Sequence, residues 1–314
     1  MAISNEALEE AGLARFMADP AVADYLGHYS SEGSRRSALY SLRAAGKALL
    51  KADPGLDLGR LDYGTVNQAL SLMARTGTPN TVNTRLCAIK GLARCLWLSE
   101  RMDSRQYERI KGIRHVRGSR ISHGRMLEDS EIMELFARCD RNNPGSGRRD
   151  AAIFAVMLGC GLRRSEVAGL DASSLHIEGE AKPFIRIVGK GNKERDVYLP
   201  GFALTRLNEW LYERGSFRGA VFTRILKSCD ITDEPLSGKA VYEICRKYGR
   251  KLGMKSWTPH DCRRTCASSL IAGGVDLVSV RDFLGHASVV TTQIYDRRSK
   301  DRLKAVADKL KLPA

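Results

Sequence analysis

Arginine, lysine, histidine and tyrosine recur in four short segments of this 314-residue chain. The segments are GLRRSEVAGL (161–170), VGKGNKER (188–195), TPHDCRRT (258–265) and LGHASVVTTQIYDR (284–297). Guanidinium groups bind anionic oxygens in planar, bidentate geometry, and lysine and histidine can transfer protons. A tyrosine phenol has a pKa near about 10, so a nucleophilic tyrosine needs a base and cationic surroundings nearby. Together these residue types are suited to covalent cleavage of a phosphodiester.

The first two segments each offer a pair of neighbouring cations. Arg163 is followed directly by Arg164, and spacing alone does not decide between them. Glu166 lies three residues after Arg163, within reach on the same helical face, where it could also form an ordinary ion pair. Lys190 lies in a Gly-Lys-Gly turn between two expected strands, with Lys193 as a near alternative. The turn lacks the frame of a nucleotide-binding P-loop.

The last two segments carry histidines at short spacings. His260 and Arg263 are three residues apart, so a helix starting at Pro259 would present both on one face. Tyr295 follows His286 by nine residues. Taken alone, such a histidine would be read as structural and such a tyrosine as core packing.

The ordered set resembles the tyrosine recombinases, also called the phage-integrase family, over about residues 120–300. The resemblance implies six catalytic residues, which are Arg163, Lys190, His260, Arg263, His286 and Tyr295. The family pattern places the catalytic arginine directly after Gly-Leu, which selects Arg163, and it selects the first lysine of the turn. It also implies that Glu166 supports the site by contacting catalytic residues rather than the phosphate.

Each of these residues takes a role from the resemblance. Arg163 and Arg263 would hold the two non-bridging phosphate oxygens, and Lys190 would protonate the departing 5′ oxygen. His260 matches the family's general acid/base. His286 would bind the phosphate and orient the nucleophile, Tyr295. Cys262 stands where the family usually has leucine, which leaves the chemistry intact.

The implied activity is site-specific DNA recombination or integration, without cofactor or metal. Tyr295 would form a 3′-phosphotyrosyl link, and four protomers would exchange strands through a Holliday junction on specific double-stranded sites, with DNA-bending accessory proteins as possible partners. Alternatives are a type IB topoisomerase-like or telomere-resolvase activity, and a catalytically silent DNA-binding regulator on the same fold. The target sequence and the kind of mobile or chromosomal element stay open.

Composition agrees with a nucleic-acid partner. The chain has 51 basic and 36 acidic residues, a formal net charge of +15, and such an excess favours polyanions. Eight cysteines without a paired framework predict reduced thiols in a cytoplasmic protein. The resemblance implies that this protein is bacterial or phage-encoded and nucleoid-associated. Cys262 and Cys266 near His260 lack a second ligand pair, so no metal site is expected. The longest apolar run, 151–162, is too short to span a bilayer.

The pattern of the chain predicts two domains joined by a basic linker. Residues 1–112 are expected to form a helical bundle, which the resemblance implies is a SAM-like core-binding domain, and residues 126–314 would then be the catalytic domain. Residues 101–125 are rich in arginine and in turn-forming residues, and a linker over 113–125 would track phosphates or remain a solvated tether. Its expected DNA-binding residues are Arg114, Arg117, Arg120 and Arg125.

The periodicity of apolar residues predicts a mainly α fold with a small antiparallel sheet, an α+β catalytic domain. Helices are expected over 34–50, 62–75, 80–98, 130–139 (capped by Ser130), 148–160, from 165, and over 202–214, 238–252, 260–273 and 276–284. Strands are expected over 183–188 and 194–199. A last amphipathic helix within 296–314 would dock on a neighbouring subunit or on its own domain.

Overall fold

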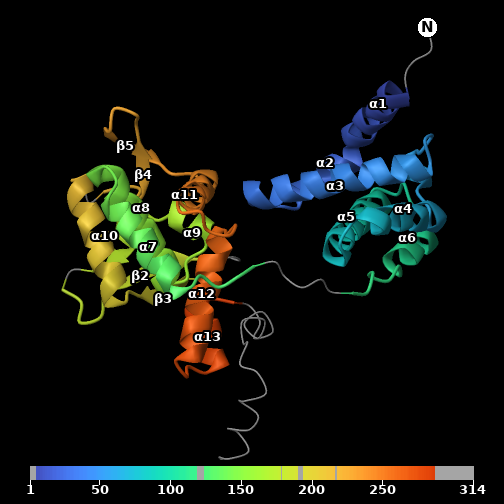
Figure 1. The fold of residues 1–314 in the computed structure, drawn as a ribbon. Helices are drawn as coiled ribbons and strands as arrows, with labels where there is room; N and C mark the ends of the chain where they lie inside the picture. The colour runs from blue at the N-terminus through green and yellow to red at the C-terminus, as the bar shows by residue number, and fades with distance from the viewer. Residues whose placement is uncertain (1–4, 119–123, 178, 190–193, 216–217, 287–314) are drawn as a thin grey trace, which may run out of the picture. The chain divides into compact units, whose positions relative to one another are not determined.

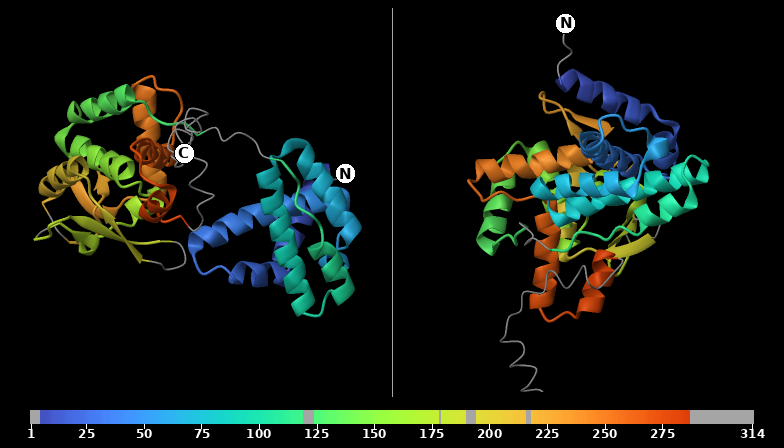
Figure 2. Two further views of the ribbon diagram at one scale, coloured as in Figure 1. Left: turned by 90° about the horizontal axis from the view of Figure 1, so that it is seen from below. Right: turned by 90° about the vertical axis from the view of Figure 1, so that its right-hand side faces the viewer.

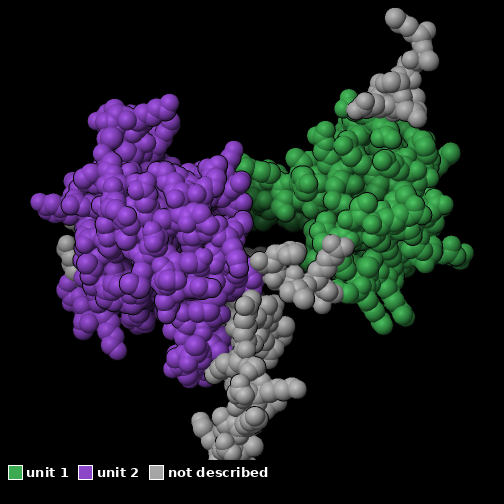
Figure 3. All heavy atoms as spheres, in the orientation of Figure 1, with its two compact units in different colours: residues 1–122 green, residues 123–314 purple. Residues whose placement is uncertain are grey.

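The chain divides into two compact units, Met1–Ser122 and His123–Ala314 (Figure 3). Each unit has its own apolar core. The computed structural model describes residues 5–118, 124–177, 179–189, 194–215 and 218–286. The elements of both units are labelled in Figure 1, and Figure 2 shows them from two further sides.

The first unit is helical throughout its described part. Its elements are α1 (Asn5–Ala18), α2 (Pro20–Gly27), α3 (Glu32–Ala52), η1 (Leu58–Arg60), α4 (Tyr63–Thr76), α5 (Pro79–Leu98) and α6 (Ser104–Lys111). The long helix α3 packs against α1, α4 and α5 (Figure 2). On α5 Leu86, Ile89, Leu92 and Leu96 are fully buried. On α3 Leu42 and Leu49 are fully buried, whereas Leu39 is 40% exposed.

Helix α6 lies within the arginine-rich residues 101–125, where no helix was expected. Asp103 caps the helix by accepting a hydrogen bond from the backbone N–H of Gln106 at 3.0 Å. The ring of Tyr107 stacks on Trp97 of α5 with centroids 4.9 Å apart, and Ile110 is fully buried. Many basic residues surround this short apolar face, which is why the sequence pattern concealed it.

Residues after α6 lie along α5 rather than forming a free tether. The Lys90 ammonium donates to the Ile113 carbonyl at 2.6 Å, and the Asn83 amide bonds both the N–H and the C=O of Val116 at 2.8 and 3.0 Å. Arg114 and Arg117 are exposed on this segment. Arg120 lies outside the described residues.

The second unit combines helices with two small antiparallel sheets, as the sequence predicted for its fold class. Its elements are α7 (Asp129–Asp140), α8 (Pro144–Gly159), α9 (Arg164–Ala168), η2 (Ala172–Ser174), β1 (Leu175–His176), β2 (Phe184–Val188), β3 (Glu194–Tyr198), α10 (Gly201–Arg214), β4 (Thr223–Ile225), β5 (Ile231–Pro235), α11 (Gly238–Lys251), α12 (Pro259–Ala272) and α13 (Leu277–Leu284). The described strands pair in the orders β1-β2-β3 and β4-β5. The second pair was not predicted.

Helix α8 forms the centre of this unit. It packs against α7, α10 and α12, and its residues from Ala151 to Met157 are almost completely buried (Figure 1). The Phe154 ring meets Tyr248 of α11 edge-on at 5.1 Å and lies 5.8 Å from Trp257, just before α12. This core therefore fixes the helices that carry the candidate site.

The start of α7 differs from the prediction. Its N-cap is Glu128 rather than Ser130, because the Glu128 backbone N–H donates to the Glu131 carboxylate at 2.9 Å in a capping box. No helix in the described residues is both long and apolar enough to cross a membrane.

Candidate active site

The first arginine of the site caps a short helix. Arg163 is the N-cap of α9, and its backbone N–H donates to Glu166 Oε2 at 2.8 Å. Its guanidinium donates through Nη1 to Glu166 Oε1 at 2.7 Å. The predicted reach of Glu166 to Arg163 is therefore confirmed, and this carboxylate fixes both the backbone and the side chain of the arginine.

A second arginine, which the sequence analysis missed, holds the same carboxylate. Arg195, the second residue of β3, donates from Nη1 and Nη2 to Glu166 at 3.1 and 2.9 Å. Burial alone would raise the pKa of Glu166, but hydrogen bonds from Arg195 and Arg163 outweigh it, so its pKa lies below the ordinary value. The only sequence signal for Arg195 was a charge at a strand position beside the Gly-Lys-Gly turn.

The start of α12 is fixed by a carboxylate. Asp261 accepts from the backbone N–H and the hydroxyl of Thr258, each at 2.8 Å, and from the backbone N–H of Arg125 at 2.8 Å. Pro259 is the first residue of the helix, as predicted. His260 lies at the helix start with part of its side chain exposed, and Arg263 follows one turn later.

Arg263 and Arg163 meet at the end of α13. Arg263, only 2% exposed, donates to the carbonyls of Gly161 and Leu284 at 2.5 and 2.6 Å. Arg163 donates to the next carbonyl, that of Gly285, at 3.0 Å. Gly285 ends α13 in the left-handed conformation with φ +66°, which favours glycine. The two guanidinium groups are thus brought together from α9 and α12.

Both histidines lie beside this arginine pair. His286 follows Gly285, and burial together with the charges of Arg263 and Arg163 lowers its pKa to about 4. Partial burial is the largest cause of a lowered pKa of His260, and the charges of Arg264 and Arg263 lower it further. Both rings are therefore neutral at pH 7 in the free protein, and an incoming anion would favour their protonation.

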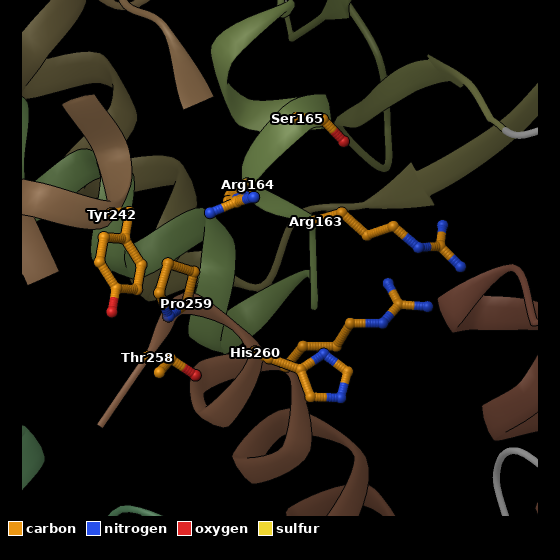
Figure 4. Close-up of a pocket in the computed structure, with 8 residues that line it drawn as sticks. Arg163, Arg164, Ser165, Tyr242, Thr258, Pro259 and His260 are labelled. Atoms are coloured by element: carbon orange, nitrogen blue, oxygen red, sulfur yellow. The ribbon is translucent and has the colours of Figure 1, made fainter. Parts of the chain in front are cut away.

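A cavity of about 340 Å³ opens beside these residues (Figure 4). Its lining residues are Arg163, Arg164, Ser165, Tyr242, Thr258, Pro259, His260 and Arg263. Figure 4 shows the side chains of Arg163 and His260 at one end, with Tyr242 and Thr258 at the other. Arginine side chains on a concave surface are suited to binding an anion.

The structure describes some of the predicted site residues and not others. It brings Arg163, His260, Arg263 and His286 together, whereas Lys190 and Tyr295 lie outside the described residues. The guanidinium of Arg125 donates to Glu131 at 2.5 and 2.8 Å and to the Lys255 carbonyl at 3.0 Å. Its predicted role in DNA binding stays a prediction.

The cysteines near His260 do not form a metal site in the described structure. Cys262 is fully buried in the core of the second unit, and burial raises the pKa of Cys266 to about 12. Within the described ranges, no group of three or more His, Cys, Asp or Glu side chains could hold a metal ion.

Comparisons with known proteins place the chain in a family. The model of the phage integrase family matches residues 125–302. Tyrosine recombinase XerD of Lacticaseibacillus casei is 31% identical over 258 residues, covering 79% of this chain and 82% of that protein. The chain belongs to the phage integrase family. The matched segment of tyrosine recombinase XerC from Actinobacillus pleuropneumoniae serotype 7 (strain AP76), 34% identical over 184 residues, covers 57% of this chain and only 57% of that protein.

Solved structures agree on the fold. The post-cleavage complex of the XerH site-specific recombinase bound to a palindromic difH substrate has a TM-score of 0.66 at 21% identity, covering 86% of this chain and 79% of that one. A lambda integrase dimer bound to a COC′ core site has a TM-score of 0.63 at 12% identity, covering 95% and 97%. At such identities the likeness concerns the fold alone.

Proposed function

We propose that the protein is a site-specific DNA recombinase with Tyr295 as its nucleophile. The observation that carries this proposal is the convergence of Arg163, Arg263 and His260 at one open cavity, with His286 beside the arginine pair, in a chain of the phage integrase family. The proteins that the chain resembles are named tyrosine recombinases.

The arginine pair binds the scissile phosphate. Each guanidinium donates a hydrogen bond to a backbone carbonyl at the end of α13, so both groups are oriented before DNA binds. The Tyr295 oxygen attacks phosphorus, the bond to the 5′ oxygen breaks, and a 3′-phosphotyrosyl link forms. The phosphotyrosyl link retains the energy of the broken phosphodiester bond. A 5′ hydroxyl of a partner strand can then attack this link, releasing the tyrosine and rejoining the DNA without ATP or metal.

Proton transfers accompany the two ester exchanges. His260, neutral in the free protein, accepts the phenolic proton in this proposal, and Lys190 protonates the departing 5′ oxygen. His286 donates a hydrogen bond to the phosphate and orients the nucleophile.

Assembly extends the proposal. We infer that four copies act on two DNA sites in the cytoplasm, that the first unit grips the duplex as a core-binding domain, and that Arg114, Arg117 and Arg120 contact phosphates. The exposure of Arg114 and Arg117 supports this role. Nucleoid association and accessory bending proteins belong to the same proposal.

A covalent-trapping experiment tests the chemistry. The Tyr295→Phe protein first selects a binding site from a pool of random duplexes. Wild-type protein is then incubated with a duplex of that site that has a nick just 3′ of the scissile phosphate. Cleavage releases the short fragment between the scissile phosphate and the nick, which has a 5′ hydroxyl and diffuses away. We expect a 5′-labelled, SDS-resistant adduct with wild type, and DNA binding without adduct for Tyr295→Phe.

Each other outcome contradicts part of the proposal. An adduct with Tyr295→Phe would assign the nucleophile elsewhere. Tight binding without any adduct from wild type would indicate a silent regulator. Relaxation of every supercoiled plasmid, without site preference, would indicate a topoisomerase.

A further inference from the structure

Arg195 connects parts of the site that the sequence keeps far apart. It lies on β3, which begins at Glu194 directly after the segment that carries Lys190. We propose that Arg195 is a positioning residue for strand cleavage: through Glu166 it fixes the direction of the Arg163 guanidinium, and it fastens the lysine-bearing hairpin to the arginine pair. This inference rests on the proposed function.

The geometry of the carboxylate supports the proposal. Glu166 Oε1 accepts from Arg163 Nη1 and Arg195 Nη1, and Oε2 accepts from the Arg163 backbone N–H and Arg195 Nη2. Each oxygen is therefore shared between the two arginines. A bidentate pair fixes the plane of the carboxylate, and the plane in turn fixes where Arg163 can point.

Burial distinguishes this pair from an ordinary surface ion pair. The side chains of Arg195 and Glu166 are 14% and 6% exposed. On the same hairpin, Arg186 and Asp196 form another bidentate pair at 2.8 and 3.0 Å, with side chains 46% and 35% exposed. The hairpin thus has a cross-strand pair at its surface, so holding two strands together does not require a buried arginine.

A second contact links Arg195 to the end of α13. A Cβ atom at Gly285 would lie only 2.8 Å from Arg195 Cδ, so the arginine stem packs directly on this glycine. The Gly285 carbonyl accepts from Arg163, and the next residue is His286. Arg195 therefore supports the arginine from two sides, by way of Glu166 and by way of the turn that carries His286.

Single-turnover cleavage of the nicked substrate, at saturating protein, tests the role. We expect Arg195→Met to lower the cleavage rate constant by about 10- to 100-fold, because small misplacements of a reacting group have effects of this size. DNA affinity should change by less than about threefold, since the residue contacts no DNA in this proposal. The matched control is Arg206→Met, which removes a bidentate pair with Asp140 at 2.8 and 2.9 Å elsewhere in the same unit.

Two further readouts separate positioning from general destabilisation. In a Glu166→Gln background, Arg195→Met should lose the part of its effect that passes through Glu166, because along that route the two residues act in series. In Arg195→Met alone, Arg163 is the one remaining cation hydrogen-bonded to Glu166 in the described structure, and burial would raise the carboxyl pKa. On acidification its cleavage rate should therefore begin to fall at a higher pH than that of wild type.

Several outcomes would overturn the inference. The inference is overturned if Arg195→Met cleaves at the wild-type rate, if the effects add in the double variant, or if Arg206→Met loses as much activity as Arg195→Met. If Arg195→Met does not fold, Arg195→Lys serves instead: it keeps the charge without the planar fork, so partial activity is expected and full activity contradicts the bidentate role. A wild-type protein that forms no adduct would instead refute the proposed function itself.

Discussion

The two units differ in what they bury. In the described part of the first unit the buried core is apolar, built from aliphatic and aromatic side chains on regular helices. The second unit buries charged and hydroxyl side chains as well, and its buried polar residues are Arg149, Asp150, Arg214, Thr223, Asp261, Arg263, Arg264 and Thr265. Several of these lie on α12, the helix that carries the candidate site.

This difference indicates what each unit is built to do. Burying a guanidinium is costly unless hydrogen bonds compensate for lost hydration. Arg263 receives that compensation from carbonyls of distant segments, at Gly161 and Leu284. Such a group contributes less to stability than an aliphatic residue would, but its direction is fixed, as binding of a phosphate requires. Substitutions in the two units should therefore affect different measurements.

The largest expected effect is on the stability of the first unit. Leu92 on α5 is fully buried, and Leu92→Ala should reduce the free energy of unfolding by about 2–5 kcal/mol because it leaves a cavity. Urea denaturation followed by circular dichroism measures the loss. The surface change Leu98→Ala on the same helix, at a residue 57% exposed, is the control. Equal losses in both variants would contradict the assigned core.

The apolar pattern that makes Leu92 important is also what made most helices predictable from sequence. The ends of α3, α4, α5, α12 and α13 lie within about two residues of the expected ends, because caps and a period of 3.6 residues are local properties. Helices α1, α2 and α6, strand β1 and the β4-β5 pair were not predicted. In α6 the apolar positions are few and interrupted by charges, so only tertiary contacts such as the Trp97–Tyr107 stack reveal it.

The second prediction concerns rate rather than stability. Arg263→Lys keeps a positive charge but loses the fork that reaches the Gly161 and Leu284 carbonyls together, so cleavage of the nicked substrate should slow by about 100-fold. Arg101 of the first unit, paired with Asp19 at 2.6 and 2.8 Å, supplies the control. A cleavage rate that falls equally in Arg101→Lys would remove the distinction between the units.

The site itself was only partly predictable. The short spacings Arg163–Glu166 and His260–Arg263 could be read as helical neighbours, and the structure confirms both local arrangements. Spacing could not show that Arg163 and Arg263 hydrogen-bond to successive carbonyls at the end of α13, because Arg163 and Gly285 are 122 positions apart and Arg263 and Leu284 are 21 apart, so each pair meets only through the fold. Arg195 was missed for the same reason.

A smaller effect is expected at the helix caps. Asp261→Ala removes an acceptor for three donors at the start of α12 and should reduce the free energy of unfolding by about 1–3 kcal/mol. Asp103→Ala at the exposed start of α6 removes one acceptor and should cost about 1 kcal/mol or less. Thermal unfolding of both variants compares them. A larger loss for Asp103→Ala would contradict the greater importance of the buried cap.

The smallest expected effect is the pH dependence contributed by His286. Its pKa of about 4 in the folded protein lies below the ordinary 6.5, so the unfolded chain binds more protons between these values. The stability linked to neutral His286 is therefore complete above about pH 6.5 and is lost as the pH falls toward about 4. Proton NMR of the histidine rings, with the His286 signal assigned by its loss in His286→Asn, should show a titration midpoint near about 4. A midpoint near about 6.5 would show that the arginine pair is too distant or too well screened to act on this ring, and the electrostatic contrast between the units would then be weaker than the burial of Arg263 implies.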